Sequence, residues 1–218
     1  MRRLQKVTRN RVEEIGISIF IAIACPASLF VLLWWSTSAL AIYRVKEIPE
    51  NIIIYVALLG LVLGILLDFL YLKELRARFY NIGVKFLIPL YIFWSAIALA
   101  FFMGMPFGNF VLGTLAGLYY GRRLYYQGSD QWFVGESVKK ISLFAALVTG
   151  IESLFMGLLG LREQIVVELI QSTLGLDPVK IVGPIGIGLV IFVTLFVIWV
   201  QYLCTRVAIG IGFKIGNE

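Results

Sequence analysis

Residues 15–43 read IGISIFIAIACPASLFVLLWWSTSALAIY and contain no charged side chain. A helix needs about 20 consecutive, mainly apolar residues to cross the hydrocarbon core of a bilayer. This run is longer than that, and its few polar residues are small hydroxyl side chains that a membrane helix tolerates. The stretch therefore predicts a transmembrane helix and places the chain among membrane proteins.

The rest of the chain has the same character. Of its 218 residues 60% are hydrophobic and 15% are charged, whereas ordinary soluble domains contain about 25% charged residues. Six apolar runs follow one another, at residues 15–43, 51–72, 84–103, 106–121, 141–160 and 183–209. We therefore predict an all-α integral membrane protein, residues 1–218 forming a single polytopic domain with six transmembrane helices.

Lysine and arginine are distributed unevenly between the two sides of such a bundle. Most of them lie before the first run, after the second and fourth runs, and at the C-terminal end. The positive-inside rule assigns the richer side to the cytoplasm. The pattern predicts a protein of the cytoplasmic membrane with both termini in the cytoplasm.

Several classes of function are excluded by composition. The chain has no histidine, so histidine-based triads and histidine-ligated haem are ruled out. Its two cysteines, Cys25 and Cys204, lie in different apolar runs and are predicted to be packing residues. No metal and no cofactor is expected. The net charge is +6, and the charged residues lie mainly between the apolar runs. This placement indicates a signal for membrane topology and attraction to anionic lipid headgroups rather than nucleic-acid binding.

Two connections carry patterns of their own. Residues 122–140 form a basic, aromatic loop that is either a docking surface for other membrane or cytoplasmic subunits or an ordinary belt at the membrane interface. In the last outer connection, apolar residues at 165, 166, 169, 170 and 174 have helical spacing. That spacing predicts an amphipathic helix lying on the outer surface of the bilayer.

An acid within a membrane helix is a candidate functional residue because burying its charge is costly. Glu152 is predicted to lie deep in the fifth run, beside Thr149. Asn109 in the fourth run and Gln201 in the last are candidate hydrogen-bond partners, and both, with Thr149, are candidate transport or ion-binding residues. Handling of a proton or cation by Glu152, and a neutral structural role for it, both remain open.

Asp68 is the second acid within an apolar run, predicted to lie near the cytoplasmic end of its helix. Arg206, in the last run, is expected at a similar depth. Because a buried charge needs a partner, an Asp68–Arg206 ion pair between helices is the structural interpretation. Ion binding or transport at Asp68 is the functional one.

The fourth run is rich in glycine. Five glycines recur every four or five residues, so that most of them share one helical face: Gly104, Gly108, Gly113, Gly117 and Gly121. A face of small residues lets two membrane helices approach closely. We interpret it as a helix-packing face, the alternative being a groove for a substrate, a lipid tail or a sliding helix.

These features favour a small membrane transporter, or the membrane subunit of one, linked to protons or cations through Glu152. The alternative is a non-catalytic membrane subunit that anchors or assembles a larger complex. An enzyme is less expected, because the chain lacks the HExxH and GxSxG motifs and any clustered acidic motif.

Overall fold

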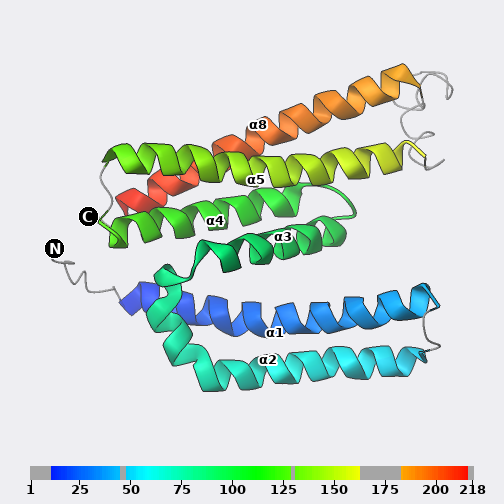
Figure 1. The fold of residues 1–218 in the computed structure, drawn as a ribbon, viewed down its shortest axis with the longest axis horizontal. Coiled ribbons are helices and arrows are strands. Elements are labelled where there is room, and N and C mark those ends of the chain that lie inside the picture. Colours follow the sequence, from blue (N-terminus) through cyan, green and yellow to red (C-terminus); the bar gives the residue numbers. More distant parts are fainter. Residues whose placement is uncertain (1–10, 45–47, 129–130, 163–182, 216–218) are drawn as a thin grey trace. The chain divides into compact units, whose positions relative to one another are not determined.

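The computed structural model describes residues 11–44, 48–128, 131–162 and 183–215, and within these ranges the chain is helical without strands. The elements are α1 (Arg11–Ile42), α2 (Glu50–Arg78), the short 3-10 helix η1 (Phe79–Asn81), α3 (Val84–Phe101), α4 (Phe107–Tyr126), α5 (Gln131–Gly160) and α8 (Pro184–Lys214). Each of the six predicted apolar runs corresponds to one long helix, whose ends differ from those of the run (Figure 1). The all-helical membrane class that the sequence predicts agrees with this architecture.

Five of the described helices, α1, α2, α3, α5 and α8, are long and apolar enough to cross a membrane. The sixth, α4, has 20 residues, which is sufficient in length. Its asparagine, its glycines and its two arginines make it less apolar than the others. These helices are those expected of an integral membrane bundle.

The helices extend beyond the apolar runs at several ends. α2 continues to Arg78, α4 continues through Arg122 and Arg123, and α5 begins at Gln131. The expected loop at 122–140 is therefore mostly helix, which corrects that prediction. The physical reason is that lysine, arginine, glutamate and glutamine are good helix formers, so an apolar run marks the membrane-embedded part of a helix and not its ends.

The basic end of α4 is packed against aromatic rings. The guanidinium of Arg122 lies 5.4 Å and 5.1 Å from the ring centres of Tyr125 and Tyr126. That of Arg123 lies 5.4 Å from the ring centre of Tyr120. Cation–π contacts of this kind stabilise charged groups beside apolar surface. The predicted amphipathic helix, in contrast, lies outside the described residues.

Contacts divide the helices into two units, and the first contains α1, α2 and η1. α1 and α2 run antiparallel along their length (Figure 1). Gly64 of α2 lies directly against the backbone of Pro26 of α1, and Gly60 lies against Leu29. Because any side chain at these two positions would meet α1 backbone atoms, the glycines set the distance between the two helices.

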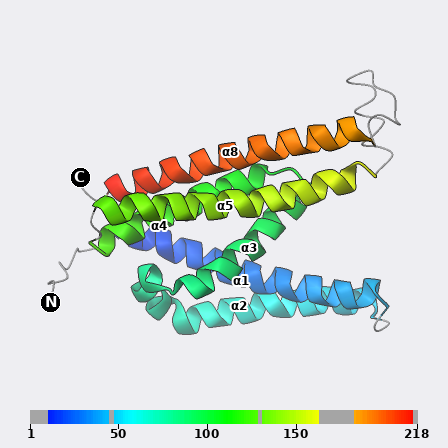
Figure 2. The ribbon, with the colours of Figure 1, turned by 45° about the horizontal axis from the view of Figure 1, so that its top comes forward.

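The second unit contains α3, α4, α5 and α8. α8 packs along both α4 and α5, as Figure 2 shows. α3 and α4 form a hairpin whose turn places Met103 and Gly104 at positive φ, 53° and 85°. Glycine adopts such angles without steric cost, so Gly104 helps the chain to reverse. The hairpin brings the end of α3 beside the start of α4, and the candidate site lies there.

Candidate functional site

Glu152 of α5 accepts two hydrogen bonds from two other helices. The hydroxyl of Ser95 on α3 donates to Glu152 Oε2 at 2.6 Å, and Nδ2 of Asn109 on α4 donates to the same oxygen at 2.7 Å. Asn109 Nδ2 also lies 3.0 Å from Ser95 Oγ. One carboxylate oxygen therefore joins three helices of the second unit.

The side chains that hydrogen-bond to Glu152 are buried, so each of their polar atoms needs a hydrogen-bond partner. The side chains of Ser95 and Asn109 are fully buried, whereas Glu152 is partly exposed. Asn109 directs its amide nitrogen to Glu152, and its Oδ1 has no hydrogen-bond partner among the described residues. A buried polar atom without a partner costs free energy. In a native protein such an atom is accounted for by strain, by a functional role, or by a bound water or ion.

Glycine beside Asn109 allows the approach of the two hairpin helices. A Cβ atom at Gly108 would lie 2.7 Å from Phe102 and 2.9 Å from Ala98, at the end of α3. Those distances are shorter than a carbon–carbon contact permits. The absence of a side chain at Gly108 therefore lets Asn109 reach Ser95 across the hairpin.

A second group of polar side chains lies beside the first. The ring of Tyr91, one turn before Ser95 on α3, packs against Phe144 of α5 with 5.6 Å between ring centres. Its hydroxyl lies within interaction range of Thr149, Gln201 and Glu152, but without the geometry of a hydrogen bond. The polar groups around Glu152 therefore continue towards α8.

The side chain of Gln201 lies in the space left by the missing side chain of Gly113. The amide of Gln201 on α8 fills the position that a side chain at Gly113 of α4 would take. Its Nε2 donates a long hydrogen bond, 3.4 Å, to Thr205 Oγ1 on the same helix, and its Oε1 has no partner among the described residues. Gln201 does not hydrogen-bond to Glu152, the partner that the sequence suggested for it.

Six side chains from four helices thus form one group, which we call the polar cluster: Tyr91, Ser95, Asn109, Thr149, Glu152 and Gln201. Its Asn109, Thr149 and Gln201 are fully buried, and each has a polar atom without a hydrogen-bond partner in the described part of the chain. Glu152 is its sole carboxylate, and no described lysine or arginine forms a salt bridge with it. In the described part of the chain, the side chains that hydrogen-bond to the acid are neutral.

The remaining glycines of α4 pack against neighbouring helices. A Cβ at Gly117 would lie 2.7 Å from the carbonyl oxygen of Thr205, and one at Gly121 would meet the carbonyl oxygen of Ile209. Gly104 lies at the hairpin turn, where a Cβ would lie 3.0 Å from Met156 of α5. From Gly113 to Gly121 the glycine face therefore abuts α8 backbone and side chains closely, and it leaves no groove there for a ligand.

Asp68 belongs to the first unit. It is buried at the contact between α1 and α2, and Cys25 of α1 faces it without the geometry of a hydrogen bond. α2 continues to Arg78, so Asp68 lies further from the helix end than the apolar run suggested. Arg206 is exposed on α8, in the second unit, and the Asp68–Arg206 ion pair stays a prediction.

Reasoning from the sequence did not identify Ser95 and Tyr91. A signal was present, because they are the only hydroxyl-bearing side chains in the run 84–101 and lie four residues apart, on one helical face. Serine and tyrosine are common in membrane helices, however. Their contact with Glu152 depends on how α3 packs, which spacing along one helix does not reveal.

In the described ranges there is no group of three or more histidine, cysteine, aspartate or glutamate side chains that could hold a metal ion. Comparison of the chain with protein families, with curated proteins and with solved structures gave no significant match.

Proposed function

We propose that this protein is a small membrane transport protein of the cytoplasmic membrane, with both termini in the cytoplasm, in which Glu152 takes up and releases a proton or a cation. The observation that carries the proposal is the pair of hydrogen bonds from Ser95 and Asn109 to Glu152 Oε2. They hold the carboxylate with neutral donors from two other helices, and no described lysine or arginine forms a salt bridge with it.

The chemistry of this arrangement differs from that of a structural ion pair. A salt bridge would fix the carboxylate in its charged form, because the nearby cation stabilises that form. Neutral donors hold the group in position and still allow its charge to change when a proton or cation binds. Both hydrogen bonds end on Oε2, so Oε1 is the oxygen that would receive the proton or cation.

The rest of the polar cluster supports a route by which a proton or cation moves away from Glu152. The hydroxyls of Tyr91 and Thr149 and the amide of Gln201 continue the polar surface from α3 and α5 to α8. Their unpartnered polar atoms offer an ion or a proton-carrying water the hydrogen bonds that an apolar core lacks. Ionisable and polar groups inside membrane bundles commonly mark such pathways.

Flux measured in liposomes tests this proposal. The purified protein is reconstituted with a pH-sensitive dye inside, and a proton gradient is imposed with and without an opposing sodium or potassium gradient. We expect protein-dependent proton flux that Glu152→Gln abolishes. Glu136→Gln is the matched control, because Glu136 is on the same helix, forms a 2.7 Å surface ion pair with Lys140, and lies outside the polar cluster.

Wild-type flux in the Glu152→Gln variant would remove Glu152 from the mechanism. Absence of flux in the wild-type protein, together with stoichiometric co-purification of other membrane subunits, would instead support the alternative of an assembly subunit.

A further inference from the structure

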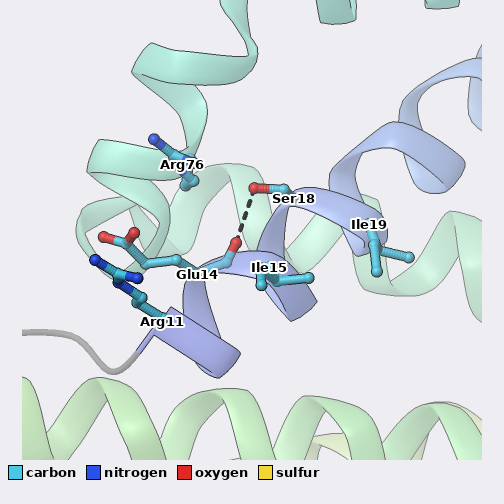
Figure 3. A pocket seen from close by; sticks show the side chains of 6 residues that line it. All are labelled: Arg11, Glu14, Ile15, Ser18, Ile19 and Arg76. Atoms are coloured by element: carbon cyan, nitrogen blue, oxygen red, sulfur yellow. Dashed lines mark hydrogen bonds between the residues drawn. The ribbon is translucent and has the colours of Figure 1, made fainter.

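The first unit contains a pocket of about 360 Å³ between the beginning of α1 and the end of α2. Figure 3 shows the side chains that line it: Arg11, Glu14, Ile15, Ser18 and Ile19 of α1, and Arg76 of α2. The lining therefore includes two arginines and one glutamate. The isoleucines supply an apolar wall beside the charged groups.

The pocket lies at the level where lipid headgroups are expected. At 1.5 Å per residue, the 32 residues of α1 extend ~48 Å and the 29 residues of α2 ~43 Å. The hydrocarbon core of a bilayer is only ~30 Å thick. Both helices are therefore longer than the core is thick. Arg11 and Arg76 lie within one turn of helix ends that also carry Glu13, Glu14 and Arg78, and such charged ends are expected outside the core.

Hydrogen bonds hold this end of the unit together. The hydroxyl of Tyr80 in η1 donates to Oε1 of Glu13 at 2.6 Å and ties the segment after α2 to the first turn of α1. The hydroxyl of Ser18 donates to the backbone carbonyl oxygen of Glu14 at 2.8 Å (Figure 3). The bond from Tyr80 thus ties the segment that follows α2 to the helix turn that carries Glu14.

We propose that this pocket binds the headgroup of an anionic glycerophospholipid such as phosphatidylglycerol. Arginine binds phosphate oxygens through two parallel N–H donors, and Arg11 and Arg76 line the pocket from different helices. Glu14 accepts hydrogen bonds from the headgroup hydroxyls. Ile15 and Ile19, which are 60% and 55% exposed, run along α1 towards the membrane core and contact the start of an acyl chain. Basic pockets between membrane helices are known sites for anionic headgroups.

The test is lipid binding by the full-length protein in detergent, measured by native mass spectrometry with phosphatidylglycerol and with phosphatidylcholine of the same acyl chains. We expect phosphatidylglycerol to bind at least tenfold more tightly. Arg11→Gln and Arg76→Gln should each reduce that preference severalfold. Arg78→Gln should leave it unchanged, since Arg78 is exposed, lies two residues from Arg76 and pairs with Glu74 at 3.2 Å.

Two further measurements keep the test decisive. Arg76→Lys keeps the charge and loses the paired donors, so an affinity between those of the wild type and Arg76→Gln supports the site even if Arg76→Gln folds poorly. Glycerol 3-phosphate, which has no acyl chain, should not compete at concentrations far above those of the lipid. Equal binding of the two lipids, wild-type preference in both arginine-to-glutamine variants, or full competition by glycerol 3-phosphate would each overturn the proposal.

Discussion

The amide nitrogen of Asn109 lies 2.7 Å from Oε2 of Glu152 and forms a direct polar bond between α4 and α5. These two helices pack mainly against α8 and only slightly against each other. The hydrogen bond therefore holds together two helices that apolar packing joins weakly. It also places a neutral donor on the acid that we propose exchanges a proton or cation.

Replacing Asn109 with alanine should destabilise the second unit and remove one of the two hydrogen-bond donors to Glu152. Interhelical hydrogen bonds in membranes contribute about 0.6–2 kcal/mol, and we expect a loss in that range. The free energy of unfolding, followed by circular dichroism during titration with sodium dodecyl sulfate, measures it. Thr114→Ala is a control on the same helix, because among the described residues the Thr114 hydroxyl bonds to the backbone oxygen of Phe110 and not to another helix. An equal loss in both variants would contradict a special contribution from Asn109.

Ser95 and Asn109 should not act independently. Both donate to the same oxygen of Glu152, and they lie 3.0 Å apart. Residues within one hydrogen-bond network show coupling energies of about 0.5–3 kcal/mol. A double-mutant cycle with Ser95→Ala and Asn109→Ala, measured by the same unfolding titration, should give a coupling within that range. Strict additivity would show that the three side chains do not form a network.

The contact between α4 and α8 should not tolerate a methyl group at Gly121. A Cβ there would meet the Ile209 carbonyl oxygen and the backbone of Gly212 and Phe213. Because backbone atoms cannot rotate away, the helices must separate, and we expect Gly121→Ala to cost about 1–3 kcal/mol in unfolding free energy. Gly210→Ala on α8, with nothing within 4 Å of its Cβ, should be neutral or slightly stabilising. A neutral Gly121→Ala variant would contradict this close contact.

The first unit makes a parallel prediction at Gly64. A Cβ at this position would meet the Pro26 backbone, whereas a Cβ at Gly16 of α1 would meet nothing within 4 Å. Gly64→Ala should therefore separate α1 from α2 and lower the thermal unfolding temperature. Gly16→Ala should leave it near that of the wild type. Equal unfolding temperatures for the two variants would show that Gly64 does not set the distance between the helices.

The helices could be predicted because hydropathy depends on composition, which the sequence states directly. The uncharged run at 15–43 lies within α1 except for Tyr43, and the run at 183–209 lies within α8 except for Gly183. The helix ends could not be predicted in the same way. Charged residues such as Arg76, Arg122 and Lys139 end an apolar run and yet continue a helix.

The residues of the candidate site that could be predicted are those that stand out as polar side chains within a single apolar run. Glu152 stands out as an acid in an apolar run, and Asn109 as an amide in another. Packing decides which helices meet at Glu152. Because Gly108 has no side chain, the end of α3 packs beside Asn109, and because Gly113 has none, the amide of Gln201 fits against α4. The positions of Ser95 and Tyr91 follow from that packing and so required the structure.

We propose that Glu152 changes its protonation while it is held by the neutral donors Ser95 and Asn109. Infrared difference spectroscopy of the reconstituted protein, recorded as the pH is raised and as sodium or potassium is added, tests it most directly. In the wild type and in Glu136→Gln, we predict that a carboxylic-acid carbonyl band disappears as the pH is raised or the cation is added. Glu152→Gln should lack this band and therefore show no such change. Spectra of Glu152→Gln identical to those of the wild type, over all conditions in which both remain folded, would contradict the account.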